Sequence, residues 1–234
     1  MKSEFAIEPF LGICEPVSAL LHLAAALVIL MTAPILLRTS RTRLRAVSMM
    51  AFIVGATLLF LMSGIYHTLD HGPTREIVQR LDHAAIWVLI VGTFTPVMVV
   101  LTRGRMRRVV IISAWTVAMS CALLKTLFFT QIPEWIGLAF YIGFAWMGAS
   151  YFVRMFRRAG LVTVGLMLGG GVSYTLGAVL EFARAPLLIP NVLGPHELFH
   201  LTIVLGVVLH WLSLHTLMTR TTPMDVALAA AQPA

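Results

Sequence analysis

The chain has 234 residues, of which 59% are hydrophobic and 12% are charged, and its formal net charge is +7. A soluble domain usually carries about 25% charged residues, so the composition excludes an ordinary water-soluble protein. The apolar residues form separate runs, each near the roughly 20 residues with which a helix crosses a bilayer, and they predict a multi-pass integral membrane protein.

Seven apolar runs predict seven transmembrane helices. Helices are expected because each span has to satisfy its own backbone hydrogen bonds in lipid, and the alternating pattern of barrel strands is missing. The predicted fold class is therefore all-α, an integral membrane bundle of seven transmembrane helices. In chain order, the runs are Pro16 to Leu37, Ala46 to Leu69, His83 to Thr102, Val109 to Phe129, Ile136 to Val153, Leu161 to Leu180, and Glu197 to Met218.

The bundle is expected to occupy residues 15–218. Residues 1–14 mix acidic, basic and apolar side chains and lack the pattern of a cleaved signal peptide, so we expect an interfacial segment there. Residues 219–234 are rich in alanine and other small residues, which predicts a flexible C-terminal tail.

Most of the basic residues lie in three short connections between predicted spans, RTSRTRLR, RGRMRR and VRMFRR. Arginines in such connections contact lipid headgroups, so the positive charge does not indicate nucleic acid as a partner. The membrane face with these connections and the C terminus carries twelve of the 17 lysines and arginines, and the opposite face carries five. The positive-inside rule then predicts a cytoplasmic C terminus and an external N terminus.

Polar and ionisable side chains occur at the ends of four predicted spans, where lipid makes such groups costly and therefore functional candidates. They are Glu15, Ser18 and His22 in the first span, Ser63 and His67 in the second, Asp82 and His83 in the third, and His196 and His200 in the seventh. With seven crossings, the starts of odd-numbered spans and the ends of even-numbered spans share one membrane face. The four groups are therefore expected to converge there.

Three of these side chains, His67, His196 and His200, have the number and type that a catalytic zinc site requires, with a fourth position left for water. Zinc lowers the pKa of such a water toward about 7. Asp82 is a candidate to take the proton or to orient a ligand histidine. Ser63 is a candidate to donate to a substrate carbonyl or to position the water, although a serine in a membrane helix often bonds to its own preceding turn.

The remaining polar residues of the first span have two possible roles. Glu15, Ser18 and His22 lie on one helix face because they are spaced i, i+3 and i+7. They are either partners of the metal ligands, in a second layer around the site, or, for Glu15 and His22, a buried hydrogen-bonded pair.

The letters HELFH, from His196 to His200, also match the zinc motif of soluble metalloproteases. Such a protease needs the glutamate as its general base and usually a further metal ligand downstream. The only later acidic residue is Asp225 in the tail, and the later histidines lie on the same predicted helix as the pair. An intramembrane protease is therefore a less favoured interpretation.

Several motifs in the same order resemble those of the hemolysin III group, part of the progestin and adipoQ receptor family. They are E-x-x-S-x-x-x-H from Glu15, S-G-I-Y-H from Ser63, L-D-H-A-A-I-W from Leu81 with G-T-F-T-P from Gly92, G-G-G-V-S-Y-T-L-G from Gly169, and H-E-L-F-H from His196. The resemblance extends from about Glu15 to Trp211 and is similar to the bacterial, short-tailed branch. It implies residence in the bacterial inner (plasma) membrane.

The resemblance also implies a chemistry. It places zinc on His67, His196 and His200 with Ser63 and Asp82 beside it, and it suggests hydrolysis of a lipid amide such as ceramide, with the lipid substrate entering from the bilayer. An alternative is a non-enzymatic membrane receptor or stress sensor with a structural zinc, and a cytolysin is a less favoured one. Related adiponectin receptors hold their zinc on the cytoplasmic side, whereas the arginine count predicts the reverse, so both orientations stay open.

Overall fold

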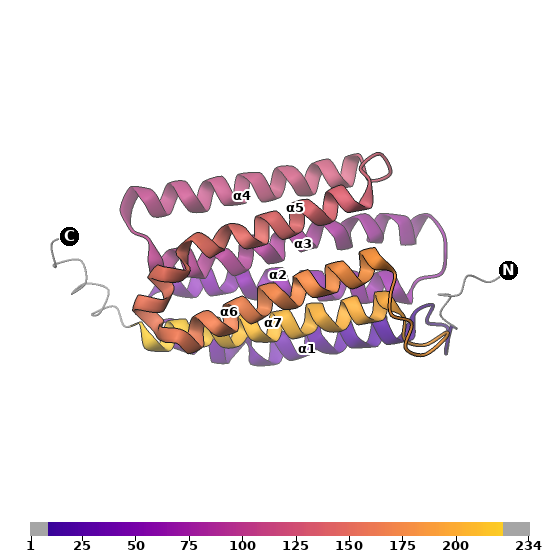
Figure 1. Cartoon of the computed structure of the whole chain (residues 1–234), viewed down its shortest axis with the longest axis horizontal. Helices are drawn as coiled ribbons and strands as arrows, with labels where there is room; N and C mark the ends of the chain where they lie inside the picture. The colour runs from indigo at the N-terminus through magenta and orange to yellow at the C-terminus, as the bar shows by residue number, and fades with distance from the viewer. Residues whose placement is uncertain (1–8, 222–234) are drawn as a thin grey trace.

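The computed structural model describes residues 9–221, which form seven α-helices, one short 3-10 helix and no β-strand. Figure 1 shows the seven α-helices lying side by side along the long axis, and α1 begins at the end of the bundle opposite to the one where α7 ends. The helices are α1 (Pro16–Thr39), α2 (Arg43–Thr68), α3 (Pro73–Leu101), α4 (Gly104–Leu127), α5 (Glu134–Trp146), η1 (Met147–Tyr151), α6 (Phe152–Ala183) and α7 (Pro195–Arg220).

Six segments of the described chain are long and apolar enough to cross a membrane by length and composition. Five are single helices, and the sixth runs continuously from Trp135 to Ala183 through α5, η1 and α6. These segments identify an integral multi-pass membrane protein, although the sequence predicted seven spans. The difference arises because α5 has only 13 residues and continues directly into η1.

The chain reverses direction between α5 and the main part of α6. Figure 1 shows the two as neighbouring rods that join at the end of the bundle where α7 finishes. Gly160, inside α6, has a φ of 82° and breaks the helical conformation there. A residue without a Cβ adopts this left-handed region without steric cost. The predicted sixth span began at Leu161, directly after this break.

The third helix begins earlier than the sequence predicted. α3 starts at Pro73, with proline in the first turn, whereas the predicted span began ten residues later, at His83. Asp82 and His83 therefore lie in the third turn of α3 and do not open it. The apolar run marks only the part of a helix that suits lipid, while backbone hydrogen bonding carries the helix further.

The ends of the described chain also refine the predicted boundaries. Residues 1–8 and 222–234 lie outside the described residues, so the expected interfacial segment and tail are described only in part. Residues 9–14 form a turn with a bridge between Phe10 and Ile13. α7 continues to Arg220, two residues beyond the predicted end of the bundle at Met218.

Glycines bring α2 and α3 into backbone contact in the centre of the bundle. A Cβ built on Gly92 would approach the backbone of Ala51, and one on Gly55 would lie 2.8 Å from the carbonyl oxygen of Val88. Close approach of this kind increases van der Waals contact between membrane helices, which lack a hydrophobic driving force for association. These contacts fix the position of α3 along α2.

The glycines of α6 differ from one another in their surroundings. A Cβ on Gly170 would collide with the His210 ring, and one on Gly177 would collide with the side chain of Thr202, so both sites allow α7 to approach closely. Gly165 has no heavy atom within 4 Å of the equivalent position. A substitution at Gly165 is therefore a control for substitutions at glycines that contact a neighbouring helix.

We expect Gly92→Ala to lower stability by about 1–3 kcal/mol, because the added methyl group meets backbone that cannot rotate away. The matched Gly165→Ala change should be neutral or slightly stabilising, since alanine favours a helix by up to about 1 kcal/mol over glycine. Thermal unfolding of both variants in the same detergent measures the difference. Equal melting temperatures for the two variants would contradict the proposed backbone contact.

Candidate metal centre

Three histidine side chains meet at the end of the bundle where α2 finishes and α7 begins. His67 lies in the last turn of α2, and His196 and His200 lie one turn apart at the start of α7. One ring nitrogen from each lies within 4.8 Å of the others, and the group could hold a metal ion. The structure thus brings together residues that are about 130 positions apart in the chain.

Each of these three rings has its Nδ1 atom directed to a partner on another segment. His67 Nδ1 contacts the Glu15 carboxylate. His200 Nδ1 lies 3.0 Å from Nε2 of His22. His196 Nδ1 lies 3.4 Å from the Glu181 carboxylate, at the end of α6. The three pairs are His67 with Glu15, His196 with Glu181, and His200 with His22.

These outer contacts occupy the Nδ1 atom of each ring and leave Nε2 as the atom that each ring can offer to a metal ion. Nε2 of His196 and Nε2 of His200 lie 3.0 Å apart. Nε2 of His67 is buried and has no hydrogen-bond partner among residues 9–221. A buried polar atom without a partner is costly, and a shared cation would satisfy all three nitrogens at once.

The donor set fits zinc in type and spacing. Zinc takes imidazole nitrogens at about 2.0–2.1 Å in tetrahedral geometry, which places two ligand nitrogens about 3.3 Å apart. The 3.0 Å separation between the two Nε2 atoms on α7 is close to that value. Three protein ligands also leave one position for another group, as catalytic zinc sites do.

The site is closed on one side and open on the other. His67 and His200 are buried, whereas the side chain of His196 is 41% exposed. The side of the group formed by His196 is therefore the side nearest the surface.

Glu15 connects three helices around His67. Its second carboxylate oxygen accepts a hydrogen bond from Arg75 on α3, and its backbone N–H donates to the carbonyl of His67 at 3.0 Å. Burial acts to raise the pKa of Glu15, but the hydrogen bond to His67 and the positive charge of Arg75 outweigh it and hold the pKa at about 2. Glu15 therefore stays a carboxylate and accepts from both partners.

Asp82 and Ser63 lie beside the histidines and are buried. Asp82 interacts electrostatically with His196 and lies near Ser63. The Ser63 hydroxyl is buried and lies next to the Asp82 carboxylate, and it does not bond back to its own helical turn. His83 lies apart from the three histidines, with its Nδ1 atom 2.9 Å from the carbonyl oxygen of Gln79.

Glu197 has both of its carboxylate oxygens engaged in holding the start of α7. The backbone N–H of Gly194 donates to one oxygen at 2.9 Å, and the hydroxyl of Ser18 donates to the other at 3.3 Å. This arrangement caps the helix that carries His196 and His200 and ties it to α1. Ser18 thus contacts Glu197 and not a metal ligand, and Glu197 is not placed as a protease base would be.

Two partners of the site, Glu181 and Arg75, were missed in the sequence. Glu181 lies one residue beyond the predicted sixth span. Arg75 lies in the first turn of α3, before the predicted start of the third span at His83. The signal that could have found Glu181 is the same parity argument: the end of an even-numbered span lies at the same face as the histidines.

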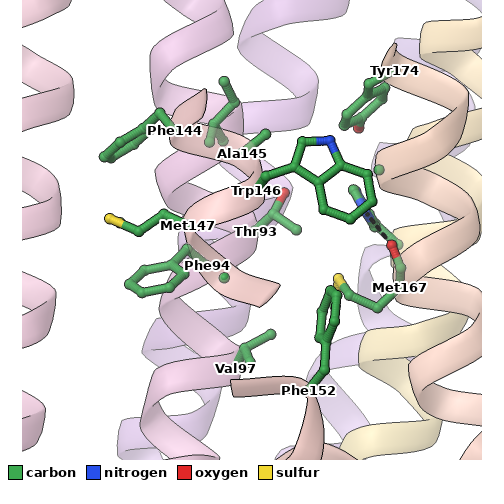
Figure 2. A pocket seen from close by; sticks show the side chains of 14 residues that line it. Thr93, Phe94, Val97, Phe144, Ala145, Trp146, Met147, Phe152, Met167 and Tyr174 are labelled. Carbon is green, nitrogen blue, oxygen red and sulfur yellow. Dashed lines mark hydrogen bonds between the residues drawn. The ribbon is translucent and has the colours of Figure 1, made fainter. Parts of the chain in front are cut away.

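A separate narrow cavity of about 60 Å³ lies deeper in the bundle, between α3, α5 with η1, α6 and α7. Figure 2 shows Trp146, Phe152 and Tyr174 around it, with Met167 on the α6 side. His210 also lines it and contacts the carbonyl oxygen of Met167 through Nε2, at 3.3 Å. The cavity is thus mainly apolar, and none of His67, His196 and His200 lines it.

Replacing any one of His67, His196 and His200 by alanine should abolish metal retention, because the two remaining nitrogens make a weaker site. Elemental analysis of protein purified after growth with zinc measures this. His215→Ala is the matched control, since His215 stacks on Trp211 and lies outside the group. Full zinc content in all three ligand variants would contradict the metal centre.

Glu15→Gln and Glu181→Gln should each weaken zinc affinity by about 10–100-fold while leaving the ligands in place, because an amide orients an imidazole less strongly than a carboxylate does. Competition with a chromophoric chelator measures the affinity. Glu76→Gln, an exposed carboxylate in the first turn of α3, is the control and should bind zinc normally. Unchanged affinity in both site variants would show that the outer contacts do not support the metal.

Comparison with known proteins identifies the chain's relatives. The profile of the family described as "Haemolysin-III related" matches residues 12–211. The chain is 27% identical over 133 residues to "Hemolysin-3 homolog" of Bacillus subtilis (strain 168), an alignment that covers 57% of this chain and 62% of that protein. It is 26% identical over 168 residues to "Hemolysin-3" of Bacillus cereus, with 72% of this chain and 74% of that protein covered.

The matched region contains α1 to α6, the larger part of α7 and all three histidines, so the resemblance inferred from the motifs is confirmed. The match covers most of the chain and includes Glu15, His67, His196 and His200. The chain therefore belongs to the haemolysin-III related family, within the progestin and adipoQ receptor family.

Proposed function

We propose that this protein is a zinc-dependent hydrolase of a lipid amide, with His67, His196 and His200 as the metal ligands. The observation that carries the proposal is the group of three histidines, each with a ring nitrogen within 4.8 Å of the others, together with the buried acid Asp82 and the buried hydroxyl of Ser63. Zinc, when bound, supplies a Lewis acid that polarises a carbonyl and acidifies water. The resemblance to ceramide-hydrolysing relatives favours an amide of a fatty acid as the substrate.

Asp82 is the proposed proton carrier of the reaction. It is 8% exposed and lies beside His196, on the open side of the site. In the hydrolysis, water adds its oxygen to the amide carbon, the carbon–nitrogen bond breaks, and a fatty acid and an amine form. Asp82 takes the proton that the water loses and returns it to the departing nitrogen.

Ser63 is the proposed donor to the substrate carbonyl. Its hydroxyl is buried next to the Asp82 carboxylate and lies one turn before His67 on α2. A preoriented donor stabilises the charge that develops on the carbonyl oxygen during attack. His22, Glu15 and Glu181 orient the ligand rings and do not contact the substrate in this proposal.

The membrane supplies the substrate. The histidine group lies at the end of apolar helices, so a lipid reaches it sideways along the bilayer and no large soluble domain is needed. Membrane lipids are therefore the proposed partners, and nucleic acid is not.

We also propose seven crossings of the bacterial plasma membrane. α5 and η1 contain 13 and 5 residues, and together they span roughly 27–30 Å at helix rises of about 1.5–2 Å per residue. That length matches a hydrocarbon core of about 30 Å. The reversal at Gly160 then allows α5 and α6 to cross in opposite directions.

Asp82→Asn should lower the release of fatty acid from ceramide or a related N-acyl lipid by at least about 100-fold, because the variant cannot carry the proton. Zinc content should stay at the wild-type level, since Asp82 is not a proposed ligand. Glu76→Gln should keep full activity. Liquid chromatography with mass spectrometry of the released fatty acid measures all three proteins.

Two outcomes would overturn the proposal. The first is a purified protein that holds zinc and releases no fatty acid from a panel of ceramides and N-acyl lipids, which favours a receptor or stress sensor with a structural metal. The second is an Asp82→Asn variant with unchanged turnover, which removes the acid from the mechanism.

A further inference from the structure

A second cavity, of about 390 Å³, lies at the end of the bundle opposite to the metal centre. It is formed by the connection between α3 and α4 together with the first turns of α6. Four of its seven lining residues are arginines. The lining residues are Leu101, Thr102, Arg103, Met106, Arg154, Arg157 and Arg158.

Within residues 9–221, these arginines have no acidic counterpart nearby. The acidic residues of the described chain lie on segments at the metal-centre end, where α1, α3, α5 and α7 begin and where α2 and α6 finish (Figure 1). They are Glu15, Asp70, Glu76, Asp82, Glu134, Glu181 and Glu197. No ion pair within residues 9–221 therefore neutralises the four guanidinium groups of the cavity.

The positive charges of the cavity also act on one another. Arg158 experiences the charges of both Arg103 and Arg154. Like charges held this close repel, and the repulsion is stronger away from bulk water. An anion placed between them removes this repulsion and replaces it with attraction.

Donor atoms in the cavity remain unused. Nε and Nη2 of Arg103 are buried and have no hydrogen-bond partner among the described residues. Arg158 uses Nη1 to donate to the carbonyl oxygen of Val100, at 2.7 Å, which fixes its side chain across the cavity wall. A guanidinium carries five N–H donors in a planar fork, so both side chains retain donors for a ligand.

The start of α4 adds backbone donors at the same place. Arg103 is the N-cap of α4, and the first hydrogen bond within the helix runs from the N–H of Arg107 to the carbonyl of Arg103, at 3.2 Å. The N–H groups of the intervening residues have no partner within the helix. The positive end of the helix dipole therefore lies beside the arginines, an arrangement that favours an anion.

We propose that this cavity binds the phosphate group of an anionic phospholipid. Arginine is suited to phosphate because its planar fork can form two parallel hydrogen bonds. Exposed apolar side chains lie on the same elements as the lining arginines: Met106, which lines the cavity, is 44% exposed, and Val153 and Phe156 at the start of α6 are 63% and 52% exposed. A lipid headgroup in the cavity would lay its acyl chains over this apolar surface, whereas a free phosphate ion would leave the surface uncovered.

The test compares three probes with the full chain in a neutral detergent: short-chain phosphatidylglycerol, short-chain phosphatidylcholine and inorganic phosphate. Binding is measured by native mass spectrometry and by the shift in melting temperature. We expect phosphatidylglycerol to bind at least about 10-fold more tightly than phosphatidylcholine, because only the former has a net negative charge for the arginines. Inorganic phosphate should give no comparable shift.

The variant Arg154→Gln with Arg157→Gln should lose this preference for phosphatidylglycerol. Both side chains are exposed and make no hydrogen bond within the described chain, so the fold should not depend on them. The matched control is Arg41→Gln with Arg43→Gln, two exposed arginines at the same end of the bundle but outside the cavity. The control changes the net charge equally and should keep the preference.

Three results would overturn the proposal. Equal binding of the two lipids would show that the cavity does not select an anion. An equal loss in the control variant would show that general surface charge, and not the cavity, attracts the lipid. Stabilisation by inorganic phosphate equal to that by phosphatidylglycerol would assign the cavity to a free anion.

Discussion

The contact between Glu15 and His67 is the interaction on which the polar end of the bundle depends. One carboxylate meets a metal-site histidine at the end of α2 and an arginine at the start of α3, while its own backbone precedes α1. Apolar helices in lipid gain little from hydrophobic burial against each other, so polar contacts and close packing decide how they associate. A single acidic residue thus joins three helix ends and sets the direction of the His67 ring.

The other two histidines depend on the same principle through different partners. Glu181 extends from the end of α6 to His196, and His22 extends from α1 to His200. Glu197 then fixes the start of α7 through its contacts with Gly194 and Ser18. Because the partners come from α1 and α6, on either side of α7, the helix cannot rotate without breaking one of them. These contacts consequently hold the three histidine side chains together as one group.

Among the described residues, negative and positive side chains are concentrated at opposite ends of the bundle. Carboxylates and the histidine group occupy one end, and arginines dominate the other, so the two ends favour ligands of opposite charge. A cation suits the first end and an anionic headgroup suits the second. The apolar helices between them keep the two ends about one bilayer apart. The proposed hydrolysis and the proposed binding of an anionic lipid therefore belong to separate ends of the molecule.

The sequence by itself determined the helical membrane class and the family, and it pointed to His67, His196 and His200. Long apolar runs and i, i+4 spacing are local properties, and the even or odd number of each crossing places span ends on one side. Only the tertiary structure decided the start of α3 at Pro73, the roles of Arg75 and Glu181, and the capping role of Glu197. These depend on how far a helix continues beyond its apolar run and on which side chain a ring nitrogen meets across helices, and neither is recorded in the spacing of residues along the chain.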